Sequence, residues 1–271
     1  MIKKDYKDLK FIDDFIFCKI LSTNPKLCKE LIELILGIKI RDIKVSESQK
    51  TVNQTYDSKG VRFDVYLEDK TNTVYYIEMQ TTLQRDLGKR TRYYQGMIDL
   101  HLIEKGAKYS NLKKTFIIFI CLDVPFPGNL PIYTFKNICE ENKSIYLDDD
   151  ATKVIINANG NRTGLSHDMC AFLDFLQNKA PHSEFTEELQ KAVEKAIDNL
   201  EWRQDYMTLL MRDQENQEIG EALGTAKTKV RNIKAAALSL GSLDKALEVL
   251  QISNKEYEEA LELIKEAGEI I

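Results

Sequence analysis

Two apolar runs separated by a short polar break constrain the fold of this chain more than any other feature. The runs cover residues 61–67 and 74–80, and Lys70-Thr71-Asn72 lies between them. Both runs alternate and are rich in Val, Tyr, Ile and Phe, which is typical of two β-strands joined by a tight connection. We therefore expect a hairpin whose two strands lie side by side.

Each run carries one carboxylate, Asp64 in the first and Glu78 in the second. Glu78 and Gln80 share a face because side chains alternate along a strand. With Asp64 opposite them, two carboxylates and an amide would converge, and the carboxylates would repel each other unless a cation lay between them. Oxygen ligands without a nearby His or Cys favour Mg²⁺ over zinc. The alternative is a solvated strand face, where a charged residue needs no functional explanation.

Further motifs follow this hairpin along the chain. They are Lys89-Arg90, Tyr93-Tyr94-Gln95, Lys105-Gly106 with Tyr109, Phe119-Ile120-Cys121, Tyr133-Thr134-Phe135 and Glu201-Trp202. In this order, with Asp64 and the Glu78-x-Gln80 pattern, they resemble the recombination-promoting nuclease (Rpn) and putative transposase family of PD-(D/E)XK proteins. The segment from Asp13 to Phe17 also resembles the first helix of that family, although Cys18 stands where the family has Lys.

The resemblance implies an α/β (α+β) fold with a restriction-endonuclease-like core, in which helices flank a central mixed sheet, plus a C-terminal helical extension. It also implies a metal-dependent DNA endonuclease associated with recombination or transposition. Asp64, Glu78 and the backbone carbonyl of Met79 would hold Mg²⁺, or Mn²⁺ or Ca²⁺ in its place, and Asp14 would complete the acidic cluster. Gln80 occupies the position that is often Lys, so it can orient a water but supplies no positive charge.

The overall charge is unusual for a protein that binds DNA. The chain has 38 Lys and Arg against 43 Asp and Glu, a net charge of −5, whereas proteins that grip duplex DNA present a basic face. Arg85, Lys89, Arg90 and Arg92 form a local basic group after the proposed site. The spacing of Arg85, Lys89 and Arg92 would gather them on one side of a helix, so we predict that the group contacts DNA phosphates. A solvated helix face is the alternative.

The periodicity of apolar residues predicts alternating helices and strands. Helices are expected at about 9–21, 27–36 and 84–104, strands at 39–45, 61–68, 74–81, 115–122, 132–138 and 154–157, and helices from Ser166 to the end. We expect a nuclease-like domain at 1–165, a helical extension packed on it at 166–224, and a helical tail at 225–271. Gly220 and Gly224 would mark a hinge before the tail.

The tail has two candidate short helices, with Ser242 as the N-cap of the first and either Ser253 or Asn254 as the N-cap of the second. Such a pair could form a helix-turn-helix that reads DNA. Its last helix is strongly acidic, however, and phosphate would repel it. A packing, dimerisation or regulatory element is therefore the favoured interpretation.

Cysteine usage and hydropathy bear on the compartment. The five cysteines are odd in number and widely spaced, which indicates reduced thiols and a cytoplasmic protein. The most apolar run, residues 116–122, is too short to span a bilayer. We expect DNA and a second copy of the chain, as a homodimer, to be the partners. Two alternatives stay open, a catalytically weak DNA-binding protein and an interaction or toxin-like protein acting through its tail.

Overall fold

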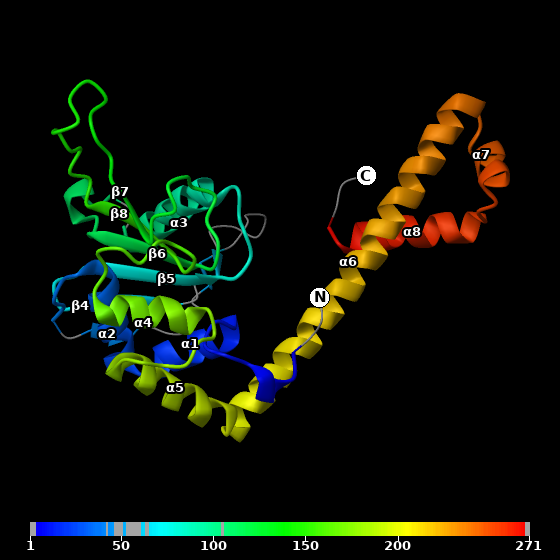
Figure 1. The fold of residues 1–271 in the computed structure, drawn as a ribbon. Helices are drawn as coiled ribbons and strands as arrows, with labels where there is room; N and C mark the ends of the chain where they lie inside the picture. Colours follow the sequence, from blue (N-terminus) through cyan, green and yellow to red (C-terminus); the bar gives the residue numbers. More distant parts are fainter. Residues whose placement is uncertain are drawn as a thin grey trace. The chain divides into compact units, whose positions relative to one another are not determined.

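The computed structural model describes residues 4–41, 43–45, 51–52, 61–62, 65–103 and 106–268 (Figure 1). The chain divides into two compact units, Met1–Trp202 and Arg203–Ile271. The expected division into 1–165, 166–224 and 225–271 stays a prediction. Each unit is described by itself.

A mixed sheet forms the centre of the first unit. In the described part of the chain its six strands lie in the order β1-β4-β5-β6-β8-β7. Their bounds are Ile43–Val45 (β1), Val65–Asp69 (β4), Val74–Gln80 (β5), Thr115–Cys121 (β6), Ala151–Asn157 (β8) and Ile132–Phe135 (β7). Strands β1, β4 and β5 are antiparallel neighbours, β5, β6 and β8 run parallel, and β7 returns antiparallel to β8.

One predicted strand proves to be two. Residues 61–68 were expected to form a single strand, but β3 (Val61–Arg62) pairs with β2 (Thr51–Val52) in a separate small sheet. Among the described residues of this run, those of β4 join the main sheet. The β4–β5 hairpin itself is confirmed, with Val65 opposite Ile77 and Glu68 opposite Val74.

Asp69 fixes the turn of this hairpin. Its Oδ1 accepts hydrogen bonds from the backbone nitrogens of Thr71 (2.8 Å) and Thr73 (3.0 Å), and its Oδ2 accepts one from the Tyr75 hydroxyl (2.9 Å). Asn72 takes the left-handed conformation, with φ 61°, which Asn tolerates better than most residues. Burial acts to raise the pKa of Asp69, but these hydrogen bonds outweigh it and lower that pKa. The turn therefore prefers an ionised Asp69.

Helices cover both faces of the sheet (Figure 1). Helix α3 (Leu87–Leu102) connects β5 to the parallel strand β6 and lies on one face. Four helices lie on the opposite side: α1 (Asp14–Thr23), α2 (Pro25–Leu36), α4 (His167–Leu176) and α5 (Glu184–Ile197). This arrangement confirms the predicted α/β fold with helices flanking a mixed sheet.

Local sequence signals explain where helices begin and end. The Asn24 side chain accepts a hydrogen bond from the backbone nitrogen of Leu27 (3.2 Å) at the start of α2, where Pro25 is the first residue. The helix ends at Gly37, with φ 64°, as its sequence predicts. Helix α3 begins at Leu87, three residues later than expected, because 81–86 form the connection from β5.

In the second unit, the described residues form a long helix and two short ones. Helix α6 (Leu200–Leu240) is unbroken at Gly220 and Gly224, so the structure has no hinge at the predicted place. Helices α7 (Leu243–Leu250) and α8 (Asn254–Glu266) follow. Ser242 and Ser253 are their N-caps, as predicted.

Two general predictions can be compared with the described residues. Among them, none of the helices combines the length and apolar character required to cross a bilayer. All five cysteines lie within the described ranges and carry free thiols, and Cys18, Cys28 and Cys121 are buried.

Candidate active site

The candidate site lies on the face of β5 that α3 covers. Tyr76, Glu78 and Gln80 lie two residues apart along β5, so their side chains share this face near the end of the strand. Tyr76 is fully buried and packs in the apolar cluster with Phe119 and Leu87. Glu78 is only 6% exposed, and Gln80 is partly exposed. A carboxylate thus sits at the border between the core and the surface.

Arg90 of α3 joins the two polar side chains of the strand. Its Nη2 donates to Oε1 of Glu78, and its Nη1 donates to Oε1 of Gln80 at 2.6 Å. The Tyr76 hydroxyl donates to the other carboxylate oxygen, so both oxygens of Glu78 accept hydrogen bonds. The Arg90 Nη2 also lies 3.0 Å from the Tyr94 hydroxyl. The fork of the guanidinium therefore holds Glu78 and Gln80 in fixed relative positions.

Two aromatic rings lie beside the Arg90 guanidinium. Its Cζ lies 5.5 Å from the ring centre of Phe119 and 5.6 Å from that of Tyr94. These separations are typical of cation–π contacts. The rings shield the Arg90–Glu78 pair from water on one side, which strengthens the attraction between the two charges.

The burial of the site perturbs its ionisable groups. Burial raises the pKa of Glu78, while the hydrogen bond from Tyr76 and the charge of Arg90 oppose that rise. Burial acts to lower the pKa of the Arg90 guanidinium, but the charge of Glu78, together with contributions from Tyr94 and Tyr76, outweighs burial and raises that pKa. Burial, with a further contribution from Glu78, raises the pKa of the neighbouring Cys121 thiol to about 12. Cys121 is therefore a neutral core residue.

The structure describes some of the predicted metal ligands and not others. Asp64 lies outside the described residues, and the described β4–β5 pairing ends at Val65 and Ile77, one position before the predicted pair. Asp14 is the first residue of α1 and is exposed, with the Cys18 thiol 3.5 Å from its Oδ1. Within the described ranges no group of three or more His, Cys, Asp or Glu could hold a metal ion. The ligand set with Asp64, Glu78, Met79 and Asp14 stays a prediction.

The residues present have donor chemistry that fits a hard divalent cation. Glu78 offers a carboxylate that burial has partly stripped of water, and the amide oxygen of Gln80 lies on the same face. Carboxylate and amide oxygens are ligands that Mg²⁺ and Ca²⁺ accept. Arg90 is the positive charge with which such a cation would compete for Glu78.

The four basic residues predicted to bind DNA separate into two kinds. Lys89 and Arg92 are exposed on α3, and Arg85 is exposed in the connection before it. Arg90 instead turns inward to Glu78. This inward role of Arg90 was not predicted from the sequence, and neither were the contacts that Tyr76 and Tyr94 make at the site. The available signals were the two-residue spacing from Tyr76 to Glu78 and the four-residue spacing from Arg90 to Tyr94.

Residues 11–221 match the family described as PD-(D/E)XK nuclease family transposase. The chain belongs to this family. The match confirms the resemblance seen in the sequence, and the mixed sheet with its flanking helices is consistent with the restriction-endonuclease-like fold of PD-(D/E)XK proteins. PD-(D/E)XK nucleases typically use divalent metal ions. Neither a curated protein nor a solved structure matches the chain. The matched region ends within α6, so α7 and α8 follow it.

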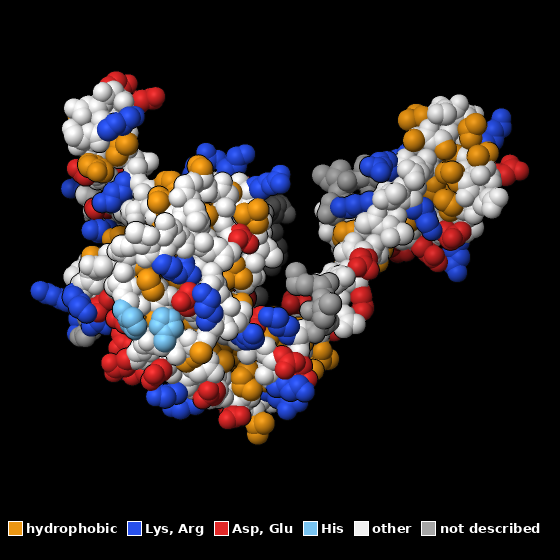
Figure 2. Space-filling model, in the orientation of Figure 1, with side chains coloured by type: hydrophobic (Ala, Val, Ile, Leu, Met, Phe, Trp, Pro, Cys, Tyr) orange, Lys and Arg blue, Asp and Glu red, His pale blue; other side chains and the backbone are white. Residues whose placement is uncertain are grey.

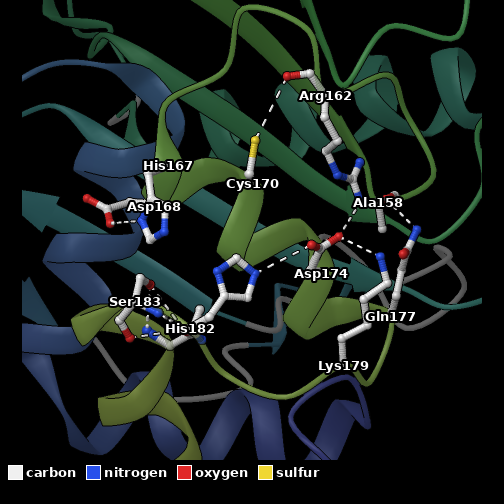
Figure 3. A network of polar contacts seen from close by, with 11 residues as sticks. Ala158, Arg162, His167, Asp168, Cys170, Asp174, Gln177, Lys179, His182 and Ser183 are labelled. Atoms are coloured by element: carbon white, nitrogen blue, oxygen red, sulfur yellow. Dashed lines mark hydrogen bonds and ion pairs between the residues drawn. The ribbon is translucent and has the colours of Figure 1, made fainter.

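A second polar cluster surrounds Asp174 on α4 (Figure 3). Asp174 accepts from Nζ of Lys179 (2.8 Å) and from Nη2 of Arg162 (3.2 Å), and Nε2 of His182 lies 3.4 Å from its Oδ2. The Lys179 hydrogen bond is the main cause of a lowered pKa at Asp174. Arg162 also donates to the backbone oxygen of Ala158 (2.7 Å). The cluster ties the end of β8 to α4, which is a structural role.

The same cluster brings together two histidines that lie 15 positions apart in the sequence, His167 and His182. The rings of His167 and His182 lie 5.5 Å apart in an edge-on arrangement. Cys170 lies nearby, but its Sγ points toward the backbone oxygen of Arg162 at 3.9 Å and away from His182 (Figure 3). A nucleophilic thiol needs a base within hydrogen-bond reach. The cluster therefore gives no thiol–imidazole pair.

Proposed function

We propose that this member of the PD-(D/E)XK nuclease family transposase family is a divalent-metal-dependent DNA endonuclease that hydrolyses phosphodiester bonds. The observation that supports this proposal most is the desolvated Glu78 carboxylate on β5, with Gln80 beside it and Arg90 bound to both. The Glu-x-Gln pair stands where the family pattern has its second acidic residue and the position that is often Lys. Family membership supports nuclease chemistry in general.

Mg²⁺ is the proposed ion, with Mn²⁺ or Ca²⁺ as the alternatives. Asp64, Glu78 and the backbone carbonyl of Met79 would hold it, and Asp14 is a further candidate ligand. When bound, such an ion lowers the pKa of a water and offsets charge on the reacting phosphate.

Arg90 would supply the positive charge that Gln80 lacks. Its Nη1 lies 2.6 Å from the Gln80 oxygen, so its charge is close to where a Lys at position 80 would act. A guanidinium pairs well with phosphate oxygens and cannot lose its proton near neutral pH. It can therefore stabilise charge that develops on the phosphate in the transition state. It would not act as a base.

Gln80 would act as a positioning group. Its Oε1 accepts from Arg90, and its Nε2 lies 3.1 Å from Oγ1 of Thr82, so both ends of the amide are oriented. An amide held in this way can hydrogen-bond a water without moving a proton. The exposed Lys89 and Arg92, with Arg85, would contact phosphates on either side of the scissile bond.

The test is cleavage of supercoiled plasmid by the purified full chain in Mg²⁺, Mn²⁺, Ca²⁺ or EDTA. We expect nicked or linear product with a divalent metal, none in EDTA, and none from Asp64→Ala or Glu78→Gln. The matched control is Glu68→Gln, which removes a carboxylate of β4 that pairs with Lys113 at 2.6 Å. Wild-type protein that is inactive in every metal, or cleavage that survives Glu78→Gln, would count against the proposal.

A DNA-binding protein without cleavage activity is the second candidate. Two observations favour it: Gln80 in place of Lys, and an ion pair with Arg90 that already neutralises Glu78. Binding of DNA without cleavage in any metal would support it.

Linear rather than nicked product would support the predicted homodimer, since two sites are then cutting opposite strands. The cytoplasmic location and the interaction or toxin-like alternative for the tail stay predictions.

A further inference from the structure

The C-terminal unit separates its charges between two helices. No acidic residue lies between Glu221 and Asp244, whereas four basic residues do: Lys227, Lys229, Arg231 and Lys234. Helix α8 is predominantly acidic, with five glutamates at positions 256, 258, 259, 262 and 266 against two lysines, Lys255 and Lys265. In Figure 2, Lys and Arg side chains gather along α6 in this unit, and Asp and Glu side chains gather near α8. The net charge of the chain conceals this separation.

Three of the basic residues share one side of α6. Lys227, Arg231 and Lys234 are spaced i, i+4 and i+7, which places them on one face over about 10 Å of helix. We call these three residues the α6 basic face. Arg231 and Lys234 are exposed and Lys227 is partly exposed. The face is thus open to solvent at Arg231 and Lys234.

Packing within the unit sets the direction of this face. Ala226 and Val230 of α6 are buried against Ala260 and Ile264 of α8. The basic face borders these packed positions, since Lys234 comes four residues after Val230, and Arg231 is its member farthest around the helix from Val230. Lys229 does not belong to it, because its Nζ lies 3.6 Å from Oε1 of Glu256 on α8. The acidic helix therefore holds a different side of α6.

Duplex DNA is the partner that fits this surface. It carries about one negative charge per 1.7 Å of its axis, so a row of cations can meet several phosphates at once. A chain with net charge −5 must bind DNA through such local surfaces. The α7–α8 pair is a poor reading element because glutamates line α8. The α6 basic face would instead contact the backbone and carry no sequence preference.

We propose that the α6 basic face is a second DNA-contact surface, separate from the candidate active site and binding the phosphate backbone of duplex DNA. This inference rests on the proposed function only in taking DNA as the ligand, and it does not depend on cleavage. It assigns α6 a role that the sequence analysis left to packing, dimerisation or regulation.

The test is the salt dependence of DNA binding by the full chain. Anisotropy of a labelled duplex is measured in EDTA, where metal-dependent cleavage does not run, from about 50 to 200 mM salt, the range over which phosphate contacts are revealed. The variant is Arg231→Gln/Lys234→Gln. The matched control, Lys255→Gln/Lys265→Gln, removes two positive charges from α8.

Each phosphate contact contributes about 0.9 to the steepness of the plot of log K against log salt. The double variant lacks two such contacts, so its plot should be less steep by about 1.8. Over this fourfold rise in salt, wild-type affinity should then fall about 12-fold more than that of the variant. The control should keep the wild-type slope. Equal melting temperatures of wild type and variants would show that the exposed substitutions leave the fold intact. If the double variant does not fold, the single Lys234→Gln variant replaces it, with half the expected change in slope.

Three outcomes would overturn the inference: an unchanged slope in the variant, an equal loss in the control, or a wild type that binds no DNA. An unchanged slope together with changed sedimentation would assign the face to a contact with a second copy of the chain instead. Failure of the proposed function looks different. Wild-type protein that binds DNA with the expected slope but cleaves nothing would refute the nuclease and leave this surface standing.

Discussion

Replacing Arg90 with Ala should expose the energetic role of the ion pair at the candidate site. The substitution leaves Glu78, whose side chain is 8% exposed, without its charged partner. Breaking a fully buried ion pair from one side costs about 3–5 kcal/mol, and a hydrogen bond to a charged group contributes about 1.5–3 kcal/mol. The Arg90 side chain is 26% exposed, so water screens part of this interaction. We expect the free energy of unfolding to fall by about 3 kcal/mol at pH 8, the lower end of the range for buried pairs.

The loss should depend on pH in a defined direction. Burial already raises the pKa of Glu78, and removing Arg90 takes away a charge that opposes this rise. A carboxyl whose pKa is higher in the folded state contributes stability below its unfolded pKa, about 4.3, and loses it as pH rises through the folded value. The destabilisation by Arg90→Ala should therefore be largest at pH 8 and should shrink as the pH falls toward 5.

Urea denaturation at pH 5, 7 and 8, followed by the fluorescence of Trp202, measures these differences. Arg92→Ala is the matched control, because Arg92 is exposed on the same helix. It should change stability by less than about 0.5 kcal/mol. Adding Glu78→Gln to Arg90→Ala should restore part of the loss, since the buried charge is then gone. If Arg90→Ala costs no more than the control, or costs the same at pH 5 and pH 8, the reasoning is wrong.

Three further predictions concern the site and the sheet. Arg90→Lys keeps a charge but loses the planar guanidinium that reaches two partners. The rate of plasmid cleavage should therefore fall by about 10-fold to 100-fold, which is no more than the rate loss expected when one oriented hydrogen-bond donor is removed from an active site. Asp69→Ala removes the hydrogen bonds of the β4–β5 turn and should lower the urea-measured stability by about 2–3 kcal/mol, and this difference should shrink as the pH falls and wild-type Asp69 protonates. Gly160→Ala would place a Cβ 2.5 Å from the Cα of Pro131 and should lower the melting temperature, whereas Gly88→Ala in α3, which has open space, should leave it unchanged or raise it.

The sequence predicted the sheet better than the site. Alternation of β-branched and aromatic residues is enough to specify the β4–β5 hairpin, and the apolar run of β6 is enough to place a strand between two covered faces. The same period of two correctly placed Glu78 and Gln80 on one face. It gave no information about which helix covers that face, because this depends on contacts between residues far apart in the chain.

The inward direction of Arg90 is the clearest example. Three neighbouring basic residues on or just before α3 are exposed. The spacing of the charges separates Arg90 from the other three but does not show whether Arg90 faces solvent or the sheet. The rotation of α3 about its axis decides it, and the burial of Leu87, Met97 and Ile98 sets that rotation. The hinge expected at Gly220 and Gly224 failed for a different reason. A glycine costs a helix only about 1 kcal/mol, and the strong helix formers around both glycines outweigh that cost.

Because Arg90 is bound to Glu78, the protein carries its own counter-ion at the place where a nuclease would hold a metal. The charge of the buried carboxylate is thus balanced by the chain itself, and the hairpin and α3 can pack together before any metal arrives. A chelator should then abolish cleavage without lowering the melting temperature. An ion bound as proposed at Glu78 would compete with the Arg90 guanidinium for the carboxylate, so its affinity would depend on exchange between two cations.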